Sequence, residues 1–405
     1  MHTSLVSTCL PQRCGIASYS HYLAEALCQT DRGGRVTLLT EQGYEAGHSR
    51  SYGVVPAFHG EGDFPTEIMR RLGEIDADVV HIQHEYGIFG ADQRFLDLLL
   101  RIKRSGLPLV VTLHTVHTNL SYNVGCGRTK MAAAFRQVDI ERYQVDVARL
   151  SNRIVVHHDS AIRKVLLRQG CEAKSVLTIP HGTAVAPESQ QAVSKLALGV
   201  PPDAPLLASF GYFTRSKNLH VLIKAFQRVK AKVPAARLWL GGYMKSTTRE
   251  ELAYRARCAR LIQEARLEQD VTFSNAFVED EDLTLLLGAA DVCCFAYEED
   301  TRSVSGAFHV ALGAGNLVVA SRIPKFQELG DVMDELLVNP RSERELSGLL
   351  LRLLLDEPFR AATRTHLLNY AIKTAWPRVA CEHLSVYRDL IRSSCADYTP
   401  RELAA

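Results

Sequence analysis

The sequence predicts an α/β protein of two doubly wound domains in tandem. Short, nearly continuous apolar segments alternate with helical patterns through most of the chain, and the alternation pauses once at a polar, proline-containing stretch. Apolar strands of this kind, separated by helices, are typical of parallel sheets that helices cover on both faces. The length of 405 residues also favours two domains over one.

In the first half of the chain, the predicted strands and helices indicate one domain over residues 1–185. The strand candidates are Leu5–Thr8, Val36–Thr40, Val79–Gln83, Leu109–Leu113, Arg153–His157 and Val176–Ile179. Helical patterns lie between them, for example at Ser18–Cys28, Thr66–Gly73 and Gln93–Arg104. We expect the stretch 186–204 to be a linker, because it is polar, rich in small residues and contains several prolines.

The same alternation resumes in the second half and indicates a second domain over residues 205–375. Its predicted strands are Leu206–Phe210, Arg237–Gly241, Val271–Ser274, Val292–Phe295, Leu317–Ala320 and Glu335–Val338. Its predicted helices are Asn218–Val233, Thr248–Leu267, Glu281–Ala290 and Ser305–Ala314, and a capping-box pattern at Ser342–Glu345 opens another.

The composition argues against several classes of protein. Hydrophobic residues make up 46% and charged residues 23% of the chain, as in soluble globular proteins, and the net charge of +2 is too balanced for a nucleic-acid-binding protein. The ten cysteines include no Cys-x-x-Cys pair, which argues against a zinc site or a disulfide framework. Without a signal-peptide pattern or an apolar run of membrane-spanning length, we expect a cytoplasmic protein. Basic stretches at Arg101–Arg104 and Arg128–Lys130 leave a weak peripheral membrane contact open.

Ligands of open parallel sheets bind beyond the carboxyl ends of the strands, so the loops that follow the strands are the candidate sites. In the first domain, Gly15 precedes a helix, where its backbone could approach an anion, and a plain turn is the alternative. Polar side chains are concentrated at the ends of two predicted strands, Val79–Gln83 and Leu109–Leu113. Gln83 ends one predicted strand and His84, Glu85 and Tyr86 follow it. His114 follows the next strand and is either functional or structural.

In the second domain, two loops could together hold an anion. Arg215 and Lys217 lie in a loop that opens a helix, and cations at such a place suit a diphosphate; exposed surface charge is the alternative. The turn Ser305-Gly306 opens another helix, whose first N–H groups have no partners within the helix and attract negative charge. An ordinary buried helix is the alternative for that segment.

The motifs argue against other cofactors. The first loop is not Gly-x-Gly-x-x-Gly, which disfavours a nicotinamide enzyme. The chain has no His-Glu-x-x-His helix, and no Asp-x-Asp motif offers an evident metal site. We therefore expect neither an obligatory metal nor a cofactor.

Six blocks, in order along nearly the whole chain, resemble those of retaining GT-B glycosyltransferases of the family 4 type. The blocks are Pro11–Ala17, His81–Gly90, Thr112–Thr115, Ile179–Gly182, Gly211–Lys217 and the Ser305-Gly306 helix, which is similar to the Ser-Gly-Thr donor loop of one bacterial subgroup. The resemblance implies two Rossmann-like domains that face each other across a cleft. It also implies that residues 376–405 form a helix that crosses back to the first domain.

The resemblance implies roles for individual residues as well. The second domain would hold a nucleotide-diphosphate sugar, either UDP- or GDP-linked, and the first domain would hold a carbohydrate or other small hydroxyl acceptor. Lys217 and Arg215 would bind the diphosphate, and His114 would contact the transferred sugar. The other donor-binding candidates are Gly15, Gly211, Phe277, Ser305, Gly306, Ala307 and Glu328, and the acceptor-side candidates are Gln83, His84, Glu85 and Tyr86. The segment Phe273–Phe277 would lie near the base, and Glu328 would reach the ribose unless it is a surface carboxylate.

The activity that the resemblance implies is retaining transfer of a hexosyl group, in the synthesis of a polysaccharide, a glycolipid or a natural-product glycoside. Four departures from the family pattern open alternatives. Arg302 and Val310 stand where many members have two glutamates, Ala307 where the subgroup has threonine, and Tyr212 where an arginine is usual. The alternatives are a catalytically degenerate nucleotide-sugar-binding or partner protein, a sugar-nucleotide epimerase and a phosphorylase.

Overall fold

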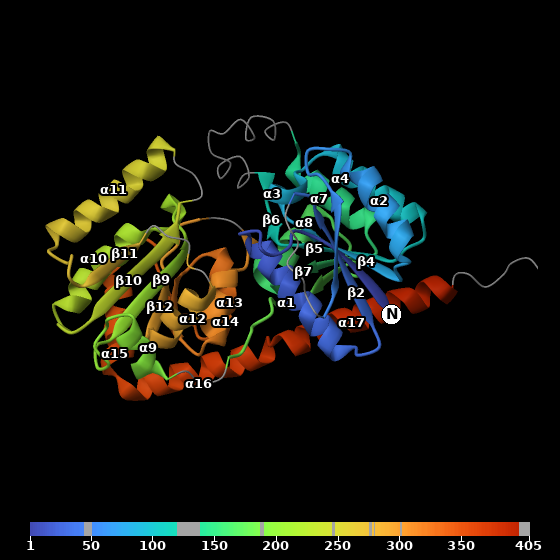
Figure 1. Ribbon diagram of the computed structural model, residues 1–405. Helices are drawn as coiled ribbons and strands as arrows, with labels where there is room; N and C mark the ends of the chain where they lie inside the picture. Colours follow the sequence, from blue (N-terminus) through green and yellow to red (C-terminus); the bar gives the residue numbers. More distant parts are fainter. Residues whose placement is uncertain are drawn as a thin grey trace, which may run out of the picture. The chain divides into compact units, whose positions relative to one another are not determined.

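The computed structural model describes residues 1–43, 51–119, 138–186, 190–244, 248–274, 278, 280–299 and 302–396. The chain forms two compact units. The first contains Met1–Gly182, Thr301–Val304 and Thr374–Ala405, and the second contains Thr183–Asp300 and Ser305–Lys373. Each unit is a sheet with helices packed against it (Figure 1).

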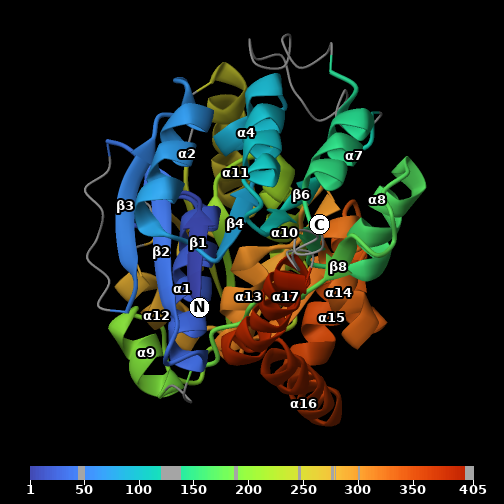
Figure 2. The ribbon, with the colours of Figure 1, turned by 90° about the vertical axis from the view of Figure 1, so that its right-hand side faces the viewer.

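The described part of the first unit is built on a seven-stranded parallel sheet in the order β3-β2-β1-β4-β5-β7-β8. Its strands are β1 (His2–Val6), β2 (Arg35–Glu41), β3 (Gly53–Phe58), β4 (Val79–His84), β5 (Leu109–Leu113), β7 (Arg153–Val156) and β8 (Val176–Thr178). Figure 2 shows β1, β2 and β3 side by side. The strand order reverses between β1 and β4, and open sheets of this kind bind ligands at such a switch point.

Helices cover both faces of this sheet. They are α1 (Gly15–Thr30), α2 (Phe64–Ile75), α3 (Tyr86–Phe89), α4 (Gln93–Arg104), α7 (Ile140–Leu150), α8 (Lys164–Gln169) and α17 (Trp376–Ala396). Successive residues of β5 point to opposite faces. Val111 packs in the core that contains α2, α4 and α7, whereas Val110 packs in the core that contains α1 and α17. Helices α1 and α17 lie side by side (Figure 1).

Strand β3 was not expected from the sequence. It lies at the edge of the sheet, and only Ala57 and Phe58 at its end are buried. It also contains Pro56, which cannot donate a backbone hydrogen bond and is confined to edge strands or bulges. The strand therefore lacks the continuous apolar run that marks the central strands.

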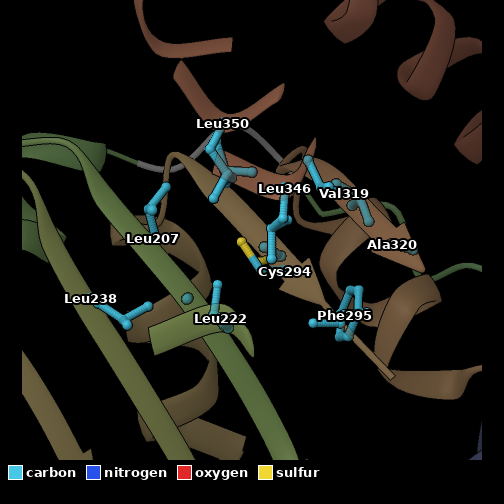
Figure 3. Close-up of a cluster of buried hydrophobic side chains, with 14 of the residues drawn as sticks. Leu207, Leu222, Leu238, Cys294, Phe295, Val319, Ala320, Leu346 and Leu350 are labelled. Atoms are coloured by element: carbon cyan, nitrogen blue, oxygen red, sulfur yellow. The ribbon is translucent and has the colours of Figure 1, made fainter. Parts of the chain in front are cut away.

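The described part of the second unit contains a six-stranded parallel sheet in the order β11-β10-β9-β12-β14-β15. Its strands are β9 (Leu206–Tyr212), β10 (Arg237–Tyr243), β11 (Val271–Ser274), β12 (Val292–Phe295), β14 (Leu317–Ser321) and β15 (Leu337–Val338). Its helices are α9 (Gln191–Ala197), α10 (Leu219–Lys230), α11 (Arg249–Glu264), α12 (Asp280–Ala289), α13 (Gly306–Gly313), α14 (Gln327–Val332), α15 (Glu343–Leu355) and α16 (Glu357–Lys373). Figure 3 shows part of the core, where Leu207 of β9 and Cys294 of β12 lie near Leu346 and Leu350 of α15. Among the described residues, no helix combines the length and the apolar character needed to cross a membrane.

The segment 186–204, expected to be a linker, contributes helix α9 to the second unit. Lys195 of α9 is almost completely buried, and its Nζ lies 2.9 Å from Oδ2 of Asp291, which immediately precedes β12. Gln191 donates a hydrogen bond from Nε2 to the carbonyl of Ala290 at 3.2 Å. Lys195 and Gln191 of this segment therefore pair with polar groups of the second unit.

Two segments from the second half of the sequence belong to the first unit. One is α17, which packs against α1. The other is the short strand β13 (Arg302–Ser303), which pairs antiparallel with β6 (Thr115–Val116). Neither β6 nor β13 was expected, because a two-residue ladder between segments so distant in sequence has no local pattern.

Helix α17 buries polar side chains against the sheet. The ring centroid of His383 lies 5.1 Å from that of His81 on β4, and the hydroxyl of Tyr387 lies 2.6 Å from Nδ1 of His81. Burial lowers the pKa of His383 to about 3 and the pKa of His81 well below its usual range. Neighbouring histidines lower both pKa values further, so these rings are neutral at pH 7.

The substitution Gly182→Ala should destabilise the first unit. A Cβ atom at Gly182 would lie 2.1 Å from Cδ2 of Trp376, at the start of α17. Overpacking typically costs about 1–3 kcal/mol. Urea unfolding should show a loss of this size for Gly182→Ala. The control Gly73→Ala in α2, where an added Cβ meets nothing within 4 Å, should show none. Equal midpoints for both variants would contradict the contact.

Acid should destabilise the first unit, because its buried histidines are neutral. An unfolded histidine takes up a proton below about pH 6.5, whereas burial lowers the pKa of His383 to about 3 in the folded chain. The contribution of these histidines to the free energy of unfolding is therefore greatest above about pH 6.5. It falls as the pH drops towards 3, by about 1.4 kcal/mol per pH unit for each such histidine. The variant His383→Leu should lose one histidine's share of this slope in denaturant titrations, and an unchanged slope would argue against a neutral His383.

Candidate active site

In the second unit, loops at the carboxyl ends of the strands meet around a lysine. Lys217 lies after β9, in the short helix Arg215–Lys217. Its Nζ lies 3.6 Å from the ring centroid of Tyr297, which follows β12. Tyr297 is buried, and its side chain is hydrogen-bonded to that of Ser305, the N-cap of α13. The structure thus brings together Lys217 and Ser305, both predicted for the site, with Tyr297 between them.

Two charged residues to which the sequence assigned no role complete this cluster. Nζ of Lys325, which follows β14, lies 2.6 Å from Oε1 of Glu299, which follows β12. Their side chains are only 16% and 17% exposed. Burial lowers the pKa of Lys217 to about 8, and the charge of Glu299 opposes that shift. Among the described residues, the cluster therefore offers an anion two lysines against one carboxylate, in a poorly hydrated position.

Arg215 does not point into this cluster. Its Nη1 lies 3.1 Å from Oε1 of Glu250 on α11, and both side chains are largely exposed. Exposed ion pairs of this kind contribute little to stability and are easily exchanged. A role for Arg215 in binding a diphosphate stays a prediction that requires its side chain to leave Glu250.

The start of α13 is open to solvent. Ser305 caps the helix by accepting a hydrogen bond at Oγ from the backbone N–H of Phe308, at 3.3 Å. Gly306 is exposed and Ala307 is half-buried, and first-turn N–H groups have no partner within a helix. Gly211, at the end of β9, is also exposed and has a φ of 128°, in a region that L side chains rarely adopt.

Glu328 lies in the interior and is not a surface carboxylate. Its Oε2 lies 3.1 Å from Nε2 of His309 on α13 and accepts a hydrogen bond at 2.8 Å from the hydroxyl of Tyr370 on α16. Nδ1 of His309 lies 2.8 Å from Oγ1 of Thr183. In this structure Glu328 therefore holds α13 against its neighbours, and the predicted contact with a ribose would need it to move.

The predicted base-binding segment is described only at its start. Phe273, in β11, is half-buried with its ring centroid 5.4 Å from that of Phe213. The guanidinium of Arg255 lies 5.3 Å from the centroid of Phe273. Phe277 lies outside the described residues.

In the first unit, Gly15 begins α1 and is exposed. The N-cap of α1, Cys14, makes no capping hydrogen bond with its side chain. An added Cβ at Gly15 would meet nothing within 4 Å, so the backbone here is open to an approaching group. This placement fits a phosphate contact, which stays a prediction.

His114 follows β5 and is buried, with both ring nitrogens hydrogen-bonded. Its Nε2 lies 2.9 Å from Oε1 of Gln83, and its Nδ1 lies 3.3 Å from Nε2 of His157. The ring of Tyr19 on α1 packs edge-on against it, with the centroids 4.7 Å apart. A sugar hydroxyl can therefore reach a nitrogen of His114 only by replacing one of these partners.

Three of the four acceptor-side candidates are buried. Gln83 and His84 have no exposed surface, and the hydroxyl of the buried Tyr86 donates to Oε1 of Gln144 at 2.9 Å. Glu85 alone is half-buried, and its Oε2 accepts a hydrogen bond from Oγ1 of Thr115 at 2.8 Å. The density of polar residues after β4 therefore reflects hydrogen bonds within the unit, with Glu85 left as the candidate nearest the surface.

Within the part of the chain that the structure describes, no group of three or more histidine, cysteine, aspartate or glutamate side chains is arranged to hold a metal ion.

Two family models match the chain, one in each half. The model described as Glycosyltransferase Family 4 matches residues 14–186, and the model described as Glycosyl transferases group 1 matches residues 204–356. No curated protein sequence matches the chain.

Solved structures share its fold over almost the whole chain. Sucrose-phosphate synthase from Thermosynechococcus elongatus is 19% identical, with a TM-score of 0.72 and coverage of 97% of this chain and 100% of that one. The Anabaena protein HepE, in complex with UDP and glucose, is 15% identical, with a TM-score of 0.69 and coverage of 96% and 100%. Trehalose-6-phosphate synthase OtsA is 12% identical, with a TM-score of 0.70 and coverage of 96% and 99%.

The fold and the two family models agree. The matched regions fall one in each half of the chain and together span most of its length, and the solved structures share its two parallel-sheet α/β units. The chain belongs to the glycosyltransferases of the GT-B fold, of the family 4 type.

Proposed function

We propose that this protein is a retaining, metal-independent hexosyltransferase that moves a sugar from a nucleotide diphosphate to a hydroxyl acceptor. The placement of Lys217 carries the proposal: its partly desolvated ammonium lies over Tyr297, which is hydrogen-bonded to the N-cap residue of α13. A departing nucleoside diphosphate develops negative charge. A fixed cation and the N–H groups at a helix start stabilise such charge electrostatically.

UDP-sugars are the first donors to test. The Anabaena protein HepE, similar in fold, has been solved with UDP and with UDP-glucose. Another similar structure, from E. coli, is bound with UDP-2-fluoro glucose. GDP-sugars stay in the test, because nothing in the described part of the base-binding segment selects one base.

In the proposed reaction, the bond between the anomeric carbon and the phosphate oxygen breaks, and the acceptor oxygen bonds to the same face of the sugar. The proton of the acceptor hydroxyl passes to the leaving phosphate. Lys217 stabilises the charge on that phosphate, and we assign the same task to Lys325, because it shares Glu299 with Lys217. His114 orients the sugar, and the acceptor binds to the first unit.

A catalytically degenerate binding protein is the second candidate. It is favoured by Val310, which is 36% exposed on α13 at a position where many family members have a glutamate. Such a protein would bind a nucleotide sugar without releasing the nucleotide in the presence of any acceptor.

A nucleotide screen tests the proposal. We expect one of UDP, GDP, ADP or dTDP, or a sugar conjugate of it, to raise the Tm of the protein without added metal. A ligand at 100 times its Kd stabilises the folded state by about 2.7 kcal/mol. Thermal-shift measurements would identify the donor class, and release of the nucleotide with candidate acceptors would then separate the enzyme from the degenerate protein. No rise in Tm with any nucleotide would overturn the proposal.

The variant Lys217→Ala should lower kcat/KM by roughly 10²–10³, the loss typical when one key electrostatic donor is removed. Nucleotide release from the donor identified by the screen measures it. Lys224→Ala is the matched control, because Lys224 is exposed on α10, and it should keep wild-type turnover. Wild-type turnover in Lys217→Ala would remove Lys217 from the mechanism.

Affinity for the nucleotide should weaken as the pH rises through about 8. Burial lowers the pKa of Lys217 to about 8, so its ammonium is charged below that pH and neutral above it. The variant Lys217→Arg keeps its charge over this range, and its affinity should stay flat in calorimetric titrations with UDP. The same pH dependence in both proteins would contradict this role.

A further inference from the structure

A chain of hydrogen bonds in the first unit joins a backbone carbonyl to His114. Nδ1 of His157, which follows β7, lies 3.0 Å from the carbonyl oxygen of Ile179. Nε2 of His157 lies 3.3 Å from Nδ1 of His114, and Nε2 of His114 lies 2.9 Å from the amide of Gln83. All three side chains are buried.

The carbonyl at one end sets the direction of every hydrogen bond in this chain. A carbonyl oxygen only accepts, so Nδ1 of His157 carries a hydrogen and donates it to Ile179. A neutral imidazole has one N–H group, so Nε2 of His157 is a lone pair that accepts. Nδ1 of His114 must therefore donate to His157, which leaves Nε2 of His114 as a bare acceptor.

This direction holds as long as both rings are neutral. Burial lowers the pKa of His114 well below its usual range, and the nearby His157, His84 and His383 lower it further. Among the described residues, no carboxylate contributes to the pKa shifts of His81, His114 or His383. His157 and His114 are 2% and 6% exposed, and burial disfavours the charged form of an imidazole, so both rings are neutral.

The hydrogen-bonding neighbours of Gln83 are compatible with an Nε2 of His114 that carries no hydrogen. A half-turn of its amide presents the nitrogen to Nε2 of His114, because the oxygen and the nitrogen exchange places. The oxygen then occupies the amide position 3.2 Å from Nε2 of His81. Nε2 of His81 also lies 2.7 Å from Oγ1 of Thr112, so His81 can share its Nε2 hydrogen between Thr112 and this oxygen while it accepts at Nδ1 from the hydroxyl of Tyr387, 2.6 Å away.

We propose that His157 is a positioning residue, which holds His114 as the Nδ1–H tautomer so that Nε2 accepts a hydrogen bond from the substrate. Gln83 occupies this acceptor in the free protein. On binding, a hydroxyl of the transferred sugar replaces the Gln83 amide and donates to Nε2. The last step rests on the proposed glycosyl transfer, whereas the tautomer does not.

Long-range ¹H–¹⁵N NMR of the full chain with ¹⁵N-labelled histidine tests the tautomer. Signals that disappear in His114→Asn identify His114. At pH 7.5 we expect a protonated Nδ1 and a bare Nε2. An Nε2–H tautomer, or an imidazolium, would overturn the proposal.

Three variants separate positioning from packing. His157→Phe keeps an aromatic ring beside Tyr19 but cannot accept from His114, so His114 should change to the Nε2–H tautomer. His157→Gln can donate to the carbonyl of Ile179 and accept from His114, so it should retain the wild-type tautomer. His181→Phe is the control, because His181 also packs against Tyr19 and His157, and it should leave His114 unchanged. An Nδ1–H tautomer in His157→Phe would show that His157 does not position His114.

The sugar contact is tested on the same spectra. The donor identified by the nucleotide screen should shift the Nε2 signal of His114, and its nucleoside diphosphate alone should not. If the donor binds without moving this signal, the sugar contact is wrong. If no nucleotide binds at all, the glycosyltransferase proposal fails and the tautomer assignment still stands on the free protein.

Discussion

Parallel pairing in both sheets is the constraint on which the rest of this structure depends. Parallel strands need crossover connections, so the carboxyl ends of all the strands lie along one edge of the sheet. In the second unit, this brings the loops after β9, β12 and β14 together around Lys217, Tyr297 and Lys325. In the first unit, it brings Gln83 and His114, from β4 and β5, within hydrogen-bonding distance.

The two units bury ionisable side chains by different means. The second unit uses oppositely charged or hydrogen-bonding partners, as between Lys195 and Asp291 or around Glu328. The first unit uses neutral rings, because burial lowers the pKa values of His81 and His114 and neighbouring histidines lower them further. Ion pairs keep a cation charged and available to an anionic ligand. Neutral rings instead give each nitrogen a definite role as donor or acceptor, which suits an uncharged sugar.

The first unit pairs two short strands that are distant in the sequence. Strand β6 begins one residue after His114, and its partner β13 ends two residues before Ser305. The chain thus passes from a ladder of the first unit directly to the N-cap of α13 in the second. His114, proposed to bind the sugar, and Ser305, proposed to bind the phosphate, are therefore each connected through the backbone to the ladder of β6 and β13.

The sequence by itself determined the alternation of strands and helices, the two parallel sheets and the loops that carry Gly15, His114, Lys217 and Ser305. Local periodicity and the position of a residue at a strand end suffice for these, since backbone geometry sets both. The family resemblance supplied the GT-B fold, which the comparisons confirmed. The edge strand β3 escaped prediction because its exposed residues and Pro56 weaken that periodicity.

Only the tertiary structure decided the partners of the site residues. It pairs Arg215 with Glu250 and Lys325 with Glu299, and it buries Glu328 against His309. In the structure, residues expected to form a linker instead form α9, and β6 pairs with β13. These contacts join residues that are distant in sequence. Which of them form depends on strand register and helix packing, and neither leaves a pattern in the local sequence.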